Sequence, residues 1–201
     1  MTWIKTVPLD EAQGRLKMLY DRIKAPDGQI DNIMAAHSLR PHTMEGHMAL
    51  YKYVLHHSAN TLPKWFLEAV GLYVSLLNKC AYCAEHHFAG MARLLGDKAR
   101  AASIRQALEA DNPAAAFDGA ELAAMIYART LTLTPDALGE PDIAALRAAG
   151  HGDGEILELN QVSAYFAYAN RTVLGLGINT DGEVLGLSPG DNADPNNWTH
   201  D

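Results

Sequence analysis

Cysteine is scarce in this chain: only two occur among 201 residues, and they stand three positions apart. A disulfide-stabilised secreted domain would carry several more, so that class is excluded. In a reducing compartment, a lone Cys-x-x-Cys pair is more often catalytic or metal-binding than a structural cross-link. The cysteine content therefore predicts a cytoplasmic protein whose two thiols take part in chemistry.

A long hydrophobic run is also absent. The most apolar segment, Trp65–Leu77, contains Glu68 and is shorter than the roughly 20 residues that a helix needs to cross a bilayer. Residues 1–5 lack the basic start and apolar stretch of a signal peptide. We therefore expect a soluble cytoplasmic protein with no membrane partner.

Positive charge is in short supply. The chain has 16 Lys and Arg against 24 Asp and Glu, which gives a formal net charge of -8. This balance argues against nucleic acid as the main partner. Because 48% of the residues are hydrophobic, the chain can bury a sizeable core, and disorder is not expected.

Alternating β-branched runs are nearly absent, whereas Ala and Leu are abundant, and this pattern predicts an all-α fold. Residues 132–135 resemble a loop, and from Ser188 the composition turns polar. We predict a single helical domain over 1–187 and a tail over 188–201. The expected helices are 10–24, 32–38, 43–57, 64–77, 80–95, 97–109, 119–130, 141–149 and 153–174.

A weak internal sequence similarity, called the internal echo below, links two of these helices. Val-Ser pairs at 74–75 and 162–163 lie in apolar helices that start with Glu68 and Glu155. The echo is compatible with two stacked helical hairpins, of which only the first carries thiols.

The chemistry is concentrated in the segment Cys80-Ala-Tyr-Cys83-Ala-Glu-His-His87. At helical spacing, Cys80, Cys83 and His87 lie on one face of a helix. Two thiols one turn apart can close a disulfide, and an imidazole and a carboxylate can move the protons that this requires. Glu68, from the preceding helix, can supply the carboxylate only through tertiary packing. These four residues are the candidate catalytic set.

The surroundings of these groups suggest how their pKa values shift. A break at residues 78–79 places Cys80 at a helix start, where the partial positive charge would lower the pKa of its thiol. The apolar neighbours of Glu68 predict a partly desolvated carboxyl with a raised pKa, suited to shuttling protons.

Two other interpretations of the segment were weighed. The cysteines can be inert core residues, although their spacing argues against it. Zinc is disfavoured because Cys80, Cys83, His86 and His87 lie on one short segment and adjacent histidines point to different sides of a helix. His86 is therefore expected to be a solvated surface residue, and no metal is predicted.

At these residues the chain resembles the AhpD-like alkylhydroperoxidases of the carboxymuconolactone decarboxylase superfamily, and most of all their peroxidase-related branch. The family pattern is a glutamate, an apolar helix with a serine, and then Cys-x-x-Cys-x-x-x-His. Later stretches at 131–135, 146–150 and 164–171 also look like that branch. In this chain the pattern falls on Glu68, Ser75, Asn78, Cys80, Cys83 and His87.

The resemblance implies an all-helical homo-oligomer, a trimer or hexamer, that reduces hydroperoxides without a cofactor. It assigns Cys83 to attack the peroxide and become a sulfenic acid, and Cys80 to resolve it as a disulfide. Glu68 and His87 would relay protons, and an external dithiol reductant would reset the pair. The helix-start argument instead favours Cys80 as the lower-pKa thiol, and the order of attack stays open.

Two positions depart from the family pattern. Leu67 stands where many relatives have an arginine before the glutamate, and Tyr82 stands where AhpD has a histidine. A tyrosine can hydrogen-bond but does not shuttle protons near neutral pH, which predicts modest peroxidase turnover.

Two further functions are kept as alternatives. One is a decarboxylase or lactone-type enzyme on the same fold that uses Glu68 and His87 with the cysteines incidental. The other is an oligomeric redox sensor whose disulfide switches packing. If the helix over 43–57 packs across the thiols, its histidines and tyrosines (His47, His57, Tyr51, Tyr53) become candidates for lining the pocket.

Overall fold

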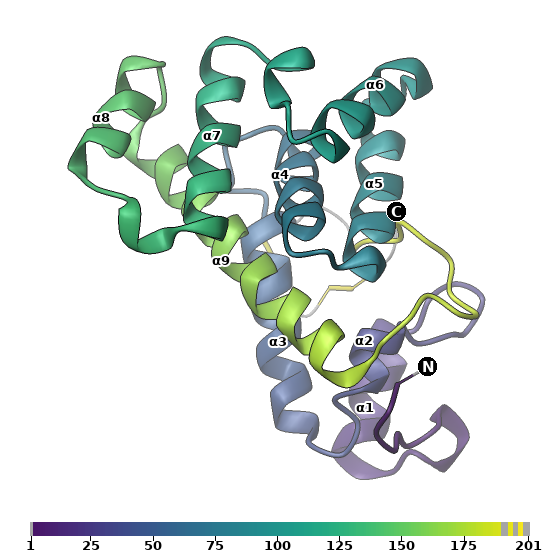
Figure 1. Cartoon of the computed structure of the whole chain (residues 1–201). Coiled ribbons are helices and arrows are strands. Elements are labelled where there is room, and N and C mark those ends of the chain that lie inside the picture. The colour runs from purple at the N-terminus through teal and green to yellow at the C-terminus, as the bar shows by residue number, and fades with distance from the viewer. Residues whose placement is uncertain (1, 190–192, 195–196, 199–201) are drawn as a thin grey trace.

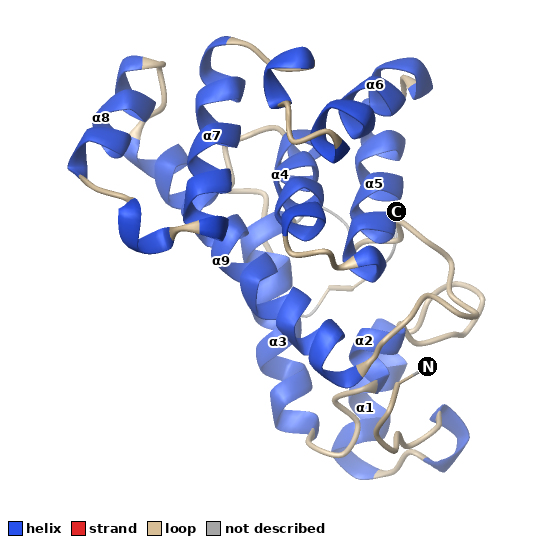
Figure 2. Cartoon of the chain, viewed as in Figure 1, coloured by secondary structure: helices blue, strands red, loops and turns tan. Residues whose placement is uncertain are grey.

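The computed structural model describes residues 2–189, 193–194 and 197–198. Within those residues the chain is helical with no β-strand, so the predicted all-α fold is confirmed (Figure 2). The α-helices are α1 (Gly14–Ile23), α2 (Asn32–Ala35), α3 (Pro41–Leu55), α4 (Lys64–Leu77), α5 (Ala81–Leu95), α6 (Lys98–Glu109), α7 (Gly119–Leu133), α8 (Glu140–Ala148) and α9 (Asp153–Leu176). Short 3-10 helices lie at Leu9–Glu11, Pro113–Ala115 and Pro135–Ala137.

Helix α4 forms the centre of the core. Its apolar sequence is buried on nearly all sides from Phe66 to Ser75, since α5, α7 and α9 pack around it (Figure 1). Each fully buried aliphatic side chain contributes about 1.5–3 kcal/mol to folding. At Gly71, a Cβ atom would lie 2.2 Å from Cε2 of Phe166, so only glycine lets α9 approach α4 this closely.

The long helix α9 runs diagonally across the molecule, and the helical hairpin of α4 and α5 packs beside it (Figure 1). Its end is set by Gly177, which adopts the left-handed conformation with φ 62°. Helix α5 ends in the same way at Gly96, with φ 64°. These two helices and α4 carry most of the side chains discussed below.

Several predicted helix ends were wrong. Helix α1 starts at Gly14 rather than Asp10, because Leu9–Glu11 forms a separate 3-10 turn. The loop expected over residues 132–135 begins later, since Thr132 bonds the carbonyl oxygen of Ala128 at 2.7 Å within α7. Helix α2 is one turn long, whereas a helix to Ser38 was expected.

The internal echo is present only in part. Ser75 and Ser163 are both buried, and each hydroxyl donates to the carbonyl four residues earlier, at 2.8 and 2.9 Å. The glutamates differ, because Glu68 is buried whereas Glu155 accepts a bond from the backbone N–H of Gly152 at the start of α9. The two stacked hairpins stay a prediction.

The segment after α9 returns to the helices. Trp198 is buried, and its ring centroid lies 6.0 Å from that of Tyr51 on α3. The predicted tail over 188–201 lies partly outside the described residues, and the domain limit at 187 stays a prediction. Among the described helices, none is both long and apolar enough to span a bilayer.

Candidate active site

The turn between α4 and α5 sets the position of both thiols. Lys79 adopts a left-handed conformation with φ 58°, and the backbone N–H of Cys80 then donates to the carbonyl of Ser75 at 2.8 Å. Cys80 is the N-cap of α5, and Cys83 follows one turn later. Both side chains are buried and both are free thiols. The two sulfurs are not at disulfide distance in this structure.

The two thiols titrate differently. A hydrogen bond from the Cys83 thiol lowers the pKa of Cys80, against an opposing effect of burial. That same bond raises the pKa of Cys83 well above its ordinary value, helped by burial and by the charge on Cys80. Cys80 is thus the more acidic thiol, as the helix-start argument expected, but the bond from Cys83 and not the helix end is the main cause.

Asn170 of α9 is a polar residue that touches this pair. Its amide hydrogen-bonds both sulfurs and lowers the pKa of each thiol. The amide nitrogen also donates to Oγ of Ser75 at 3.0 Å, and its oxygen accepts from Asn78 at 2.9 Å. A fully buried amide with these partners holds the α4–α5 turn against α9.

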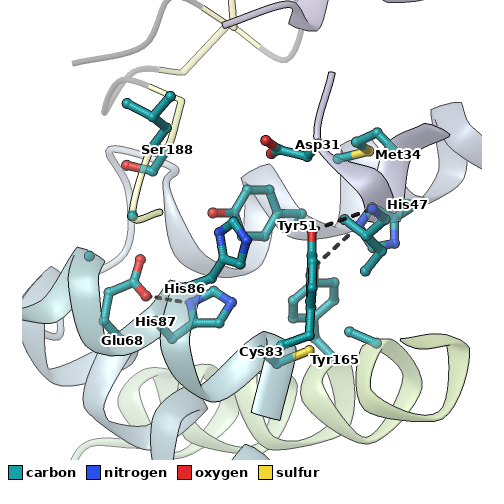
Figure 3. Close-up of a pocket in the computed structure, with 16 residues that line it drawn as sticks. Asp31, Met34, His47, Tyr51, Glu68, Cys83, His86, His87, Tyr165 and Ser188 are labelled. Carbon is teal, nitrogen blue, oxygen red and sulfur yellow. Dashed lines mark hydrogen bonds and ion pairs between the residues drawn. The ribbon is translucent and has the colours of Figure 1, made fainter. Parts of the chain in front are cut away.

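Glu68 and His87 meet across α4 and α5. Oε2 of Glu68 lies 2.5 Å from Nδ1 of His87 (Figure 3). The imidazole also stacks edge-on against Phe166, with ring centroids 4.4 Å apart. Because Nδ1 is held by the carboxylate, Nε2 is the nitrogen that His87 can turn to a reactant.

The predicted rise in the pKa of Glu68 was wrong. Burial does raise it, but the charge and hydrogen bond of His87 outweigh burial, and the charges of His56 and Arg93 add to the effect. The pKa of Glu68 is consequently lowered, and the side chain is a carboxylate at neutral pH. It orients His87 instead of carrying the proton itself.

His86 was expected on the surface, and this was wrong. Its side chain is only 12% exposed, and its Nε2 lies 3.0 Å from Oε2 of Glu183, in the segment after α9. Each of the two adjacent histidines meets its own carboxylate. Among the described residues, no three His, Cys, Asp or Glu side chains gather closely enough to hold a metal ion.

A cavity of about 50 Å³ joins these groups (Figure 3). Cys83, His86, His87 and Glu68 all contribute to its wall, whereas Cys80 does not. The remaining wall comes from α2 and the residue before it, α3, α5, α9 and the segment after α9: Asp31, Ile33, Met34, His47, Tyr51, Tyr82, Gly90, Tyr165, Ala169, Gly186, Leu187 and Ser188. The cavity has room for a few water-sized groups.

Comparison with known proteins places this arrangement in a known fold. Neither a family model nor a curated protein matches the chain. Among solved structures, a peroxidase-related protein of Ralstonia eutropha JMP134, described as an alkylhydroperoxidase AhpD core, aligns with TM-score 0.76 and 18% identity over 89% of this chain and 91% of that one. A peroxidase-related protein of Silicibacter sp. TM1040 aligns with TM-score 0.69 and 22% identity over 88% and 87%.

The chain has the AhpD-like helical fold. A third structure with this fold is the debrominase Bmp8, in a cysteine-to-alanine variant that binds 2,3,4-tribromopyrrole. It aligns with TM-score 0.72 and 16% identity over 90% of this chain and 93% of that one. The fold predicted from the Glu68, Cys80, Cys83 and His87 pattern is therefore confirmed. Because the sequence identities are this low, the comparisons show the fold alone, and the activity has to be argued from the residues of the site.

On this AhpD-like fold, helix α3 does pack across the thiol pocket. His47 and Tyr51 line the cavity, whereas Tyr53 is exposed and His57 lies outside the wall. Burial raises the pKa of Tyr51 well above its ordinary value, so its phenol stays protonated. Burial is also the main cause that lowers the pKa of His47 to about 3.

Sequence reasoning missed other residues of the site. Asn170 had a weak signal, a lone amide in the apolar stretch of α9. Glu183 and Asp31 had none, because each lies in a loop: Asp31 lines the cavity, and Glu183 contacts His86, only through the path of the chain. His56, with Nε2 3.7 Å from Oε1 of Glu68, was one histidine among several in its part of the chain.

Proposed function

We propose that this chain is a thiol-dependent hydroperoxide reductase in which Cys83 and Cys80 form the redox pair and Glu68 and His87 relay protons. One observation supports it most: Cys83 shares a cavity of about 50 Å³ with an imidazole that a buried carboxylate orients. Because the pKa of Cys83 is raised, this thiol needs a base beside it, and His87 is in place to serve.

The reaction can be written with these groups alone. Nε2 of His87 takes the proton of Cys83, through water or directly. The thiolate attacks the outer oxygen of the peroxide, so that an S–O bond forms, the O–O bond breaks, and an alcohol or water leaves. The sulfur of Cys80 then displaces water from the sulfenic acid, and the disulfide that forms is reduced by an external dithiol. The low pKa of Cys80 suits this second attack.

The size of the cavity supports a small substrate. Pockets for drug-sized ligands enclose roughly 300–1,000 Å³, whereas this one encloses about 50 Å³. Hydrogen peroxide or a small alkyl hydroperoxide fits such a space better than a substituted aromatic ring.

The test compares Cys83→Ser with the wild type in hydroperoxide consumption driven by a dithiol such as dithiothreitol. We expect turnover to disappear in Cys83→Ser. In Cys80→Ser, one equivalent of peroxide should still be consumed, and a sulfenic acid rather than a disulfide should form. Unchanged turnover in Cys83→Ser would reject the proposal.

The two alternatives predict other outcomes. A decarboxylase or lactone-type enzyme would keep its activity after alkylation of both thiols, because Glu68 and His87 would do the chemistry. A redox sensor would oxidise without catalytic turnover and change its assembly. Sedimentation of the reduced and oxidised protein tests this, and it also tests the prediction that the chain forms a trimer or hexamer.

A further inference from the structure

Two neighbouring histidines of α5 form two separate imidazole–carboxylate pairs at one cavity. His87 pairs with Glu68 of α4, and His86 pairs with Glu183 from the segment after α9. Both imidazoles line the cavity beside Cys83. Figure 3 shows both rings on the side of the cavity that α5 forms. The reaction described above uses only the first pair.

The carboxylate of the second pair is as buried as that of the first, and it is held by hydrogen bonds. The Glu183 side chain is 3% exposed, and its carboxylate has three hydrogen-bond partners. Its Oε1 accepts from the hydroxyl of Tyr82 at 2.9 Å and from the backbone N–H of Asn32, while Oε2 faces Nε2 of His86 at 3.0 Å. These three contacts fix the carboxylate against α5 and α2 and hold the ring of His86 at the cavity wall.

Peroxide reduction makes two proton demands at different atoms. The thiol must lose a proton before it attacks, and the oxygen that leaves must gain one, since an alkoxide is a strong base and a poor leaving group. His87 meets the first demand. Nε2 of His86 is held by Glu183, so Nδ1 is the ring nitrogen that can serve the cavity.

We propose that His86, oriented by Glu183, is the general acid that protonates the oxygen leaving from the hydroperoxide. This inference rests on the proposed hydroperoxide reduction. Cys83 gives its proton to His87, its sulfur bonds the outer peroxide oxygen and is oxidised by two electrons, and the O–O bond breaks. The departing alkoxide takes its proton from His86, and solvent returns that proton. Glu183 and Tyr82 are positioning residues.

A purely structural role for the pair must be distinguished from this one. Glu183 can instead be a clamp that fastens the segment after α9 to α2 and α5. A clamp would affect every substrate equally, whereas a general acid matters most when the leaving oxygen is strongly basic. The leaving group therefore separates the two roles.

The experiment measures the rate at which the reduced enzyme is oxidised in a single turnover by tert-butyl hydroperoxide and by peracetic acid. The first expels an alkoxide, and the second expels acetate, a weak base. For His86→Asn we expect a loss of about 100-fold with tert-butyl hydroperoxide and of less than about threefold with peracetic acid. His42→Asn, at an exposed histidine of α3, is the matched control and should change neither rate.

Glu183→Gln keeps an acceptor oxygen for Tyr82 and Asn32 and removes the carboxylate oxygen that faces His86. We expect it to show the same preference with a smaller loss, and it keeps the test open if His86→Asn folds poorly. Equal losses with the two oxidants, or no loss with either, would overturn the role of His86. If the wild-type Cys83 reacts with neither oxidant, the hydroperoxide reductase itself is rejected.

Discussion

Nδ1 of His87 lies 2.5 Å from the carboxylate of Glu68, and that carboxylate is almost completely buried between α4 and α5. The pair has two consequences. The carboxylate orients an imidazole at the wall of the cavity that holds Cys83, and its own pKa is lowered by that imidazole.

The first prediction concerns Glu68→Gln. The amide can still bond His87 but no longer stabilises its protonated form, so transfer of the Cys83 proton becomes unfavourable. We expect peroxide turnover to fall by about 10²-fold. The matched control is Glu85→Gln, which removes a carboxylate of α5 that pairs with Arg105 outside the cavity. Turnover in Glu68→Gln equal to that of the control would contradict the relay.

The same substitution gives a prediction for stability against pH. A carboxyl whose pKa is lowered by folding stabilises the protein above its unfolded pKa, and this contribution is lost as the pH falls through its folded pKa. The difference in unfolding free energy between the wild type and Glu68→Gln should therefore shrink below about pH 4. Urea titrations at neutral and acid pH measure it, and a constant difference would argue against the lowered pKa.

The thiols give a third prediction. In Cys80→Ser, the Cys83 thiol no longer donates to a neighbouring thiolate and no longer feels its charge, so the pKa of Cys83 should fall. In Cys83→Ser, Cys80 exchanges a thiol donor for a hydroxyl, and its pKa should change less. Ultraviolet absorbance of the thiolate, followed against pH, reports both values. An unchanged pKa of Cys83 in Cys80→Ser would mean that the two sulfurs are not coupled.

The fourth prediction uses buried histidines. Burial lowers the pKa of His47 to about 3 and, against the charge of Glu68, that of His56 to about 4. On acidification below about pH 6.5, the unfolded chain binds these protons and the folded protein does not, so stability falls. From pH 7 to pH 5 the loss is on the order of 2 kcal/mol for each histidine.

His47→Gln removes one of these groups and keeps an acceptor for the hydroxyl of Tyr165, which lies 3.4 Å from Nε2 of His47. The variant should lose less stability than the wild type between pH 7 and pH 5, as measured by urea unfolding. His42→Gln, at an exposed position of the same helix, should behave as the wild type. Equal losses in all three proteins would contradict this prediction.

The fifth prediction concerns the contact between α4 and α9. In Gly71→Ala the new methyl group would overlap the ring of Phe166, which supports His87. Overpacking of this kind costs typically about 1–3 kcal/mol. Gly46→Ala is the control, because Gly46 also lies within a helix but has open space around it, and there alanine should stabilise by up to about 1 kcal/mol. Thermal unfolding compares the two variants, and a Gly71→Ala protein as stable as the control would show that the helices can separate freely.

The sequence by itself determined the helices and the local part of the site. Helix α4 has the limits that its apolar run predicts, Lys64–Leu77, because its ends are set by neighbouring residues. Cys83 and His87 were placed on one face of a helix, and both line the cavity because they lie one turn apart on α5, whereas Cys80 lies outside the cavity wall.

Tertiary structure alone decided the rest. Glu183 meets His86 across 97 residues, and Asn170 meets Ser75 across 95, and no local pattern encodes either contact. The direction of the pKa shift at Glu68 could not be predicted from the sequence either, because it depends on whether burial or the charge of His87 dominates. The balance between burial and charge depends on the distances between helices. Those distances are set by side-chain packing, such as that of Phe166 against Gly71.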